Sequence, residues 1–148
     1  MDTDARNIGP VTNLPLPRFV SMKSRETNVR RGPSLTHRID WVYKLQGMPL
    51  EIVAEYGHWR RVRDKDGFGG WVHYSMLSGA RTVLVSVESL DLQIRPDPRS
   101  AVIARLQQGV VARLGDCLPD WCKLQVGSHR GWARKSALWG VAATEIRD

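Results

Sequence analysis

An internal repeat with a period of about 60 residues limits this chain to a duplicated fold. His58–Val62 (HWRRV) matches Asp120–Leu124 (DWCKL), and Gly70–Val72 (GWV) matches Gly131–Ala133 (GWA), in the same order. The offset between the copies drifts, so insertions fall between the matching segments, where loops are expected. The repeat therefore predicts two small domains rather than one.

The openings of the two copies also align. Asn28–Ser34 (NVRRGPS) aligns with Gln93–Arg99 (QIRPDPR), and each is a strand end that runs into a proline-containing loop. In this alignment Val29 matches Ile94 and Arg30 matches Arg95.

Local patterning predicts an all-β chain. Short apolar runs rich in Val, Ile, Leu and Trp alternate with Gly, Pro, Asp and Ser clusters at intervals of about 8–12 residues, which is typical of small β-barrels. Asp64–Gly69 predicts a hairpin turn, because an Asp-Gly pair accepts the positive φ that tight turns need. Sustained helical periodicity is absent.

The domain organisation follows from these patterns. We expect two tandem modules at residues 18–79 and 80–140. Residues 1–17 combine Pro, Asn, Asp and Thr with few large apolar side chains and are predicted to be a flexible leader. Residues 141–148 are predicted to be a C-terminal tail.

The six tryptophans are the natural candidates for core and site residues. A domain of about 60 residues buries only about 60% of its unfolded surface, so each module needs large side chains in its core. Trp71 and Trp132 each follow a Gly in a predicted strand, and we expect both in the cores. Trp59 and Trp121 begin strands and are equally compatible with a core and with a binding surface.

The charge of the chain favours anionic partners. The formal net charge is +7, and both repeats are basic. Such a surface attracts nucleic acid, phospholipid headgroups or acidic wall polymers, although plain solubility also explains it. No apolar run approaches the roughly 20 residues of a membrane-spanning helix.

Three motifs of the first copy resemble the bacterial SH3-like domain. They are Val29–Pro33 (VRRGP), Gly57–Val62 (GHWRRV) and Gly70–Leu77 (GWVHYSML). The second copy keeps Ile94-Arg95, Trp121 and Gly131-Trp132, but has Asp97-Pro98 in place of Gly-Pro. The resemblance implies two tandem five-stranded SH3-like barrels of a kind common in bacterial envelope proteins, often attached to wall hydrolases as targeting units.

The resemblance also implies a compartment. Family members with two modules typically carry a secretion signal, whereas Met1–Asp4 begins acidic and is not followed by an apolar stretch. We therefore expect a periplasmic or secreted protein whose signal peptide has been removed; the alternative is a cytoplasmic protein.

The resemblance further implies ligand-binding positions. The eukaryotic relatives of this family bind proline-rich peptides through a groove of Trp, Pro and Tyr. By the resemblance, the matching positions are Trp59, His73 and Met76 in the first module, and Trp121, Arg134 and Ala137 in the second. Only the tryptophans are the aromatic residues that a proline-rich peptide requires, so recognition of such peptides is not expected. The groove tryptophan of the first module is bordered by basic side chains that could bind carboxylates or phosphates: Arg30, Arg31, Arg60 and Arg61.

Cys117 and Cys122 flank a predicted turn. Cross-strand partners beside such a turn lie about 5.5 Å apart at Cα, which a disulfide can span. We favour the bond over two reduced core thiols, and it would indicate an oxidising compartment. The two cysteines and His129 supply at most three metal ligands without a familiar spacing, so neither a metal nor a cofactor is expected.

These observations predict a binding protein and not an enzyme. No Ser or Cys nucleophile lies beside a recognisable base motif, and the glycines near Asp66 lack the ending of a phosphate-binding loop. The first hypothesis is an envelope-associated module that binds peptidoglycan, a muropeptide or a protein partner. The alternative is a cytosolic basic barrel that binds single-stranded nucleic acid.

Overall fold

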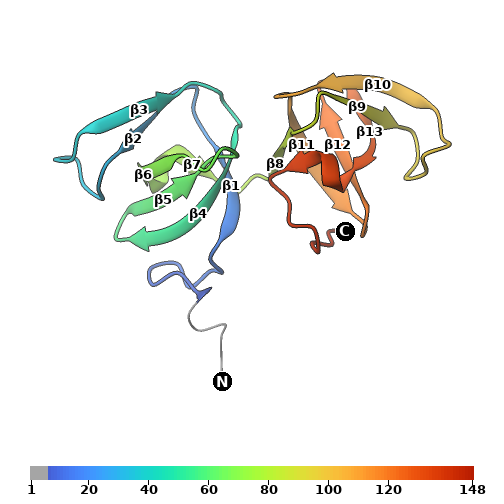
Figure 1. Ribbon diagram of the computed structural model, residues 1–148. Coiled ribbons are helices and arrows are strands. Elements are labelled where there is room, and N and C mark those ends of the chain that lie inside the picture. The colour runs from blue at the N-terminus through green and yellow to red at the C-terminus, as the bar shows by residue number, and fades with distance from the viewer. Residues whose placement is uncertain (1–6) are drawn as a thin grey trace. The chain divides into compact units, whose positions relative to one another are not determined.

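The computed structural model describes residues 7–148, and all of its regular structure is β-strand apart from short 3-10 turns. The chain divides between Ala80 and Arg81 into two compact units, here called module 1 and module 2. Each is a curled sheet closed into a barrel-like shape (Figure 1). The predicted all-β fold with two tandem small domains is confirmed. None of the helical turns in residues 7–148 has the length and apolar character to cross a bilayer.

Module 1 is a seven-stranded sheet with the strand order β3-β2-β6-β5-β4-β1-β7. Its elements are β1 (Arg18–Met22), β2 (Thr27–Arg30), β3 (Ile39–Tyr43), β4 (Pro49–Tyr56), β5 (Trp59–Arg63), β6 (Gly69–His73), the 3-10 turn η2 (Tyr74–Met76) and β7 (Leu77–Ser78).

Module 2 repeats this order as β10-β9-β13-β12-β11-β8-β14. Its elements are β8 (Thr82–Val85), β9 (Ser89–Gln93), β10 (Val102–Gln107), β11 (Val111–Cys117), β12 (Trp121–Val126), β13 (His129–Arg134), the 3-10 turn η3 (Lys135–Ala137) and β14 (Leu138–Trp139). Each sheet has seven strands rather than the five implied by the resemblance, because the first strand of each module and a two-residue last strand join the sheet.

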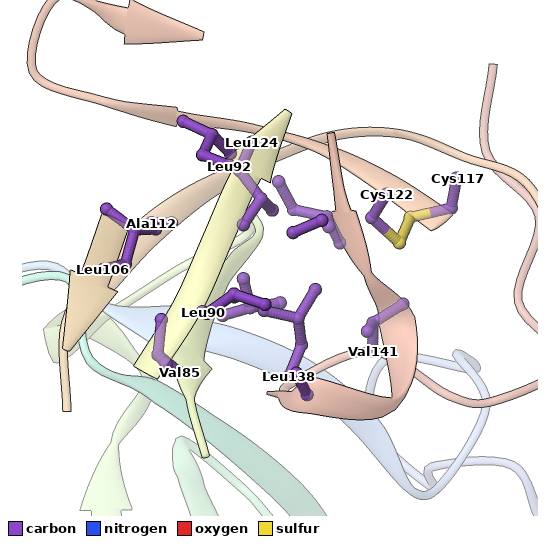
Figure 2. Packing of buried hydrophobic residues seen from close by; sticks show 14 residues of the cluster. Val85, Leu90, Leu92, Leu106, Ala112, Cys117, Cys122, Leu124, Leu138 and Val141 are labelled. Carbon is purple, nitrogen blue, oxygen red and sulfur yellow. A yellow bond between two sulfur atoms is a disulfide. The ribbon is translucent and has the colours of Figure 1, made fainter. Parts of the chain in front are cut away.

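Both cores are built from aliphatic side chains. The core of module 1 contains Val20, Met22, Val29, Leu50, Ile52, Val62 and Val72. The core of module 2 is larger and includes Val85, Leu90, Leu92, Leu106, Ala112, Leu124, Leu138 and Val141 beside the two cysteines (Figure 2).

The prediction that Trp71 and Trp132 form the cores is wrong, because both are only half-buried and neither belongs to a core cluster. Successive side chains of a strand point to opposite faces. The inward positions on these strands are held by Val72 and Ala133, which are fully buried, so the adjacent tryptophans face outward.

The glycine before each of these tryptophans has a packing role. A Cβ atom on Gly70 would lie 2.8 Å from the carbonyl oxygen of Arg30. A Cβ atom on Gly131 would lie 2.8 Å from the carbonyl oxygen of Gln93. The glycines therefore allow β6 and β13 to approach the neighbouring strands closely.

The alignment of the two openings is also corrected by the structure. Arg30 of β2 pairs with Trp71, and Gln93 of β9 pairs with Trp132. Arg30 therefore corresponds to Gln93, not to Arg95, and the fully buried Val29 corresponds to the fully buried Leu92. The predicted alignment was shifted by two residues because it matched the Arg and Pro side chains of exposed loops.

Residues 7–17, expected to be part of a flexible leader, are held against module 1. Gly9 N–H donates to the Leu14 carbonyl at 2.7 Å, and Ile8 forms an isolated bridge with Pro15. The N–H groups of Val11 and Thr12 donate to the Glu55 carboxylate at 3.0 and 2.9 Å. This buried acceptor on β4 anchors the segment; the rest of the predicted leader, residues 1–6, lies outside the described residues.

Candidate functional site

Four rings form a contiguous surface where β5, β6 and η2 meet in module 1. This ring cluster consists of His58, Trp59, His73 and Tyr74. Trp59 lies opposite His73 across the β5–β6 pair, with ring centroids 5.3 Å apart in a T-shaped arrangement. The centroid of Tyr74 lies 4.9 Å from that of His73 and 5.6 Å from that of His58. Tyr74 is 50% exposed, so the cluster presents aromatic and imidazole edges to solvent.

Local hydrogen bonds hold these rings in place. Tyr74 N–H donates to the His58 carbonyl at 2.9 Å, which ties η2 to the β4–β5 turn. Gly57 permits that turn with a φ of +55°. The Nδ1 atom of His73 accepts the Ser75 N–H and caps η2. Because Nδ1 is occupied, Nε2 is the ring nitrogen of His73 that remains for a ligand.

Met76 completes the predicted groove set of module 1. It lies in η2, is half-buried, and packs against the core of the module. The structure therefore brings Trp59 and His73 together at the surface, whereas Met76 packs against the core.

The predicted arginines are placed differently. Arg60 is 7% exposed and donates to the carbonyls of Gly57 and Trp59 at 2.8 and 2.9 Å. Its Nε atom lies 3.9 Å from the Glu55 carboxylate. These contacts make Arg60 an interior residue that supports the ring cluster from below.

Arg30 and Arg31 lie beside the loop that joins β2 to β3. Arg30 donates to the carbonyls of Leu35 and His37 at 3.2 and 2.9 Å, so it holds the loop. Gln93 does the same in module 2 by donating to the carbonyls of Asp97, Pro98 and Ser100. Arg31 is exposed and lies 3.6 Å from Asp40.

The corresponding groove of module 2 is closed. Trp121 is only 7% exposed, and the Arg134 guanidinium lies 4.4 Å from its ring centroid. This cation–π contact covers the indole. Ala137, which replaces Met76, is buried in the core. Trp121 and Arg134 are thus adjacent, as the resemblance implied, but they contact each other.

The C-terminal segment Val141–Asp148 packs on module 2. The backbone of Arg147 pairs with Cys117 through two hydrogen bonds of 2.8 and 3.0 Å. The buried Lys135 donates to the carbonyls of Ala143 and Glu145 at 3.3 and 2.7 Å. Hydrogen bonds from Arg81, stronger than the opposing effect of burial, lower the pKa of Glu145. The predicted tail is therefore an integral part of the module.

One cross-strand position differs between the modules in its chemistry. Glu55 faces Arg60 across the β4–β5 pair, and Cys117 faces Cys122 across the β11–β12 pair. Cys117 and Cys122 form the predicted disulfide, which is confirmed. A buried ion pair in module 1 thus occupies the place of a disulfide in module 2.

The ion pair is completed by the N-terminal segment. Besides the two N–H donors, the Glu55 carboxylate accepts the Thr12 hydroxyl at 2.6 Å and the Arg18 guanidinium at 2.9 Å. Burial raises the pKa of Glu55, but these hydrogen bonds outweigh it and lower the pKa to about 2. Glu55 is therefore ionised at neutral pH and has no free lone pair for a ligand.

The other reactive side chains of residues 7–148 do not form a metal site or a catalytic group. No group of three or more His, Cys, Asp or Glu side chains converges there as a metal site would. The Nδ1 atom of His73 lies 2.7 Å from the Ser75 hydroxyl oxygen. This contact is local, because His73 is the N-cap of η2 and Ser75 lies in that turn. His58 and Tyr74, which the sequence did not single out, join the site because η2 folds back onto the β4–β5 turn.

Comparison with known proteins agrees with this arrangement. The model of the family described as "Bacterial SH3 domain" matches residues 23–79 and 88–140. A Bacillus subtilis protein named "Putative N-acetylmuramoyl-L-alanine amidase YrvJ" is 30% identical over 135 residues. That match covers 83% of this chain and 26% of the relative, so the chain spans about a quarter of the relative's length.

Two solved structures from Trichomonas vaginalis, NlpC2 and NlpC1, are also similar. Their identities are 12% and 11%, and the TM-score is 0.38 for each, which is too low to support an argument. The matches cover 83% and 88% of this chain and 48% of either solved chain. The two segments that match the family model fall one in each module, and on this evidence the chain belongs to the bacterial SH3 domain family, as a tandem pair of its modules.

Proposed function

We propose that this chain binds peptidoglycan through the ring cluster of module 1, and that it binds without catalysing a reaction. The observation that carries the proposal is the surface cluster of half-buried Trp59 and His73 and exposed Tyr74, on a hairpin and a turn held by hydrogen bonds. Aromatic walls with a few fixed polar atoms are typical of ligand sites. The family and the name of the Bacillus subtilis relative support the cell wall as the source of the ligand.

The ligand that fits the ring cluster best is a stem peptide or a short glycan of the wall. The rings provide flat apolar surfaces, and the Nε2 atom of His73 and the Tyr74 hydroxyl provide hydrogen bonds to amides or sugar hydroxyls. A protein partner with an extended peptide would make the same contacts. Module 2 contributes less, because its equivalent indole is covered by Arg134.

The non-catalytic role is supported by how the reactive side chains are used. Both cysteines are joined in a disulfide, so neither is a nucleophile. The Nδ1 atom of His73 also accepts the Ser75 backbone N–H, which serves turn capping rather than activation of the Ser75 hydroxyl.

A periplasmic or extracellular location belongs to the same proposal. Disulfides persist in oxidising compartments, and Cys117–Cys122 is formed in module 2. A wall-binding protein must reach the wall, so the proposed ligand and the disulfide require the same side of the cytoplasmic membrane.

Sedimentation with purified sacculi tests the proposed function. The intact chain should sediment with sacculi, and soluble muropeptides should compete. His73→Ala removes the half-buried imidazole of the cluster and should weaken binding by about fivefold. His129→Ala, at an exposed histidine of module 2, is the matched control and should bind like the wild type.

The alternative prediction of nucleic-acid binding gives a different outcome. Binding of a single-stranded oligonucleotide that falls steeply with salt, with no sedimentation on sacculi, would overturn the proposal. Two of the four arginines expected beside Trp59 are less available for phosphates, because Arg60 is interior and Arg30 is bonded to its own loop.

A further inference from the structure

Module 1 has a second aromatic surface at the other end of the β5–β6 hairpin. This aromatic hollow is formed by Trp41, Tyr43 and Phe68. The Trp41 centroid lies 6.3 Å from that of Tyr43 and 6.5 Å from that of Phe68, both in T-shaped arrangements. Trp41 and Phe68 line two cavities of the hollow. The smaller, of about 400 Å³, is completed by Tyr43 and Asp64, and the larger, of about 490 Å³, lies on the side of Arg61 and Arg63. Both volumes are within the range of small-ligand sites.

The hollow is separate from the ring cluster. Trp59 and His73 pair at one end of β5 and β6, whereas Arg63 and Gly69 pair at the other end. Four residues of strand correspond to about 13 Å. A ligand in the hollow therefore does not compete for the rings of the cluster.

Phe68 is exposed but held in a fixed position. It is 65% exposed at the tip of the hairpin. Its N–H donates to the Asp64 carboxylate at 3.0 Å, and its carbonyl accepts Asp64 N–H at 2.7 Å and the Tyr43 hydroxyl at 3.3 Å. Because the backbone of Phe68 is fixed while its ring is exposed, binding a partner costs little conformational entropy of the hairpin tip, which favours a binding role.

The hollow is specific to module 1. The strand registers place Ala104 and Leu106 where module 1 has Trp41 and Tyr43. His129 takes the place of Phe68. The aromatic residues are therefore not required by the fold itself, because module 2 forms the same sheet without them.

The larger cavity of the hollow carries positive charge. Arg61 lines it and is exposed, and its guanidinium makes no hydrogen bond or ion pair within the described part of the chain. Arg63 also lines it and pairs with Glu51 at 2.6 Å. The carboxylate of Asp64, which accepts hydrogen bonds from Tyr43 and from backbone N–H groups, lines the smaller cavity and not the larger one. A ligand in the larger cavity therefore meets the rings of Trp41 and Phe68 and one uncommitted cation.

We infer that the aromatic hollow binds an acetylated amino sugar that bears a carboxylate, as the muramic residue of peptidoglycan does. This inference rests on the proposed function only in taking the cell wall as the source of the ligand. The chemistry of the ligand is argued from the residues of the hollow. The sugar ring packs against Trp41 and Phe68, and its carboxylate pairs with the Arg61 guanidinium. Module 1 then holds one polymer at two places, the glycan in the hollow and a further part at the ring cluster.

Nuclear magnetic resonance on the full chain, labelled with 15N, tests this inference. The probes are N-acetylmuramic acid and, as the neutral comparison, N-acetylglucosamine. We expect N-acetylmuramic acid to shift the Trp41 indole signal and the Phe68 amide signal. Arg61→Gln should weaken its binding by about fivefold and leave the weaker binding of N-acetylglucosamine unchanged.

Two control variants separate local effects from general ones. Arg25→Gln removes an equal charge from an exposed arginine of module 1 and should not change binding. Phe68→Ser should weaken binding of N-acetylmuramic acid by about tenfold. Ile94→Ser, at a 53% exposed residue of module 2, should not. The amide spectrum of each variant reports that it is folded.

The outcomes separate this inference from the proposed function. Absence of shifts at Trp41 and Phe68, or equal affinity of Arg61→Gln and the wild type for N-acetylmuramic acid, would overturn the inference even if sacculi bind. Failure of the wild type to sediment with sacculi, with the Trp41 shift present, would overturn the proposed function and leave the hollow as a sugar site.

Discussion

Glu55 is the residue whose charge most affects the stability of module 1. Hydrogen bonds lower its pKa from 4.5 to about 2. A lowered pKa stabilises the folded state above pH 4.5, and this stabilisation is lost as the pH falls through the folded-state value of about 2. We predict that the free energy of unfolding of module 1 decreases by about 3 kcal/mol over this interval.

Hydrogen exchange of module 1 amides as a function of pH measures this effect. Glu55→Gln should remove most of the dependence between these pH values. Glu26→Gln, at an exposed glutamate of the same module, should retain it. An unchanged dependence in Glu55→Gln would show that other carboxylates cause the loss of stability at low pH.

Gly70 gives a second prediction at the scale of one residue. A Cβ atom there would lie 2.8 Å from both the Arg30 carbonyl oxygen and the Val29 Cγ1 atom. Gly70→Ala should therefore destabilise module 1 by about 1–3 kcal/mol, measured by urea unfolding. At Gly79 a Cβ atom would meet nothing within 4 Å, so Gly79→Ala should change stability by less than about 0.5 kcal/mol.

Single residues were the hardest part to predict from the sequence. Trp59 and His73 were identified as site residues through the family motif, and they are adjacent in the structure. The outward orientation of Trp71 was missed, because a short apolar strand does not reveal which face is inward. The interior role of Arg60 depends on Glu55, and such long-range partners leave no local pattern.

At the scale of elements, strands and turns followed from local pattern, whereas the terminal segments did not. Asp64–Gly69 is the predicted turn, with Gly67 at a φ of +84°. The segment after β14 is short and follows the last matching segment of the repeat, so the sequence predicted a tail. Its position instead depends on side-chain bonds from Lys135 and Arg81 to Glu145 and on backbone pairing with Cys117. A local pattern in the segment does not reveal these partners.

The C-terminal segment supports the third prediction. Arg81 forms a bidentate pair with Glu145, at 2.7 and 3.0 Å, and a part-buried pair of this kind contributes about 1 kcal/mol or more. Arg81→Gln should speed hydrogen exchange of the Arg147 amide by about tenfold. Arg99→Gln, which breaks an exposed contact with Asp97, should leave that amide unchanged. Equal protection of Arg147 in both variants would contradict an anchoring role for Arg81.

At the scale of the whole molecule, the repeat predicted two modules but not their divergence. Both sheets have the same strand order, and each has its own core. Duplication of the fold did not preserve the exposed aromatic surfaces, because Arg134 covers Trp121 and the aromatic hollow is absent from module 2. The matching strands of the two modules are needed to form each sheet. Exposed side chains contribute little to folding, so they can differ between the modules.

The different chemistry of the two hairpins allows each module to be destabilised separately. Closing the short loop between Cys117 and Cys122 contributes about 2 kcal/mol by the chain-entropy estimate. A reductant should therefore lower the free energy of unfolding of module 2 by about this amount and leave module 1 unchanged. Glu55→Gln should have the opposite selectivity, because its partners all lie in module 1. Amide exchange followed separately in each module measures both effects, and equal loss of protection in the two modules under reductant would mean that they unfold as one cooperative unit.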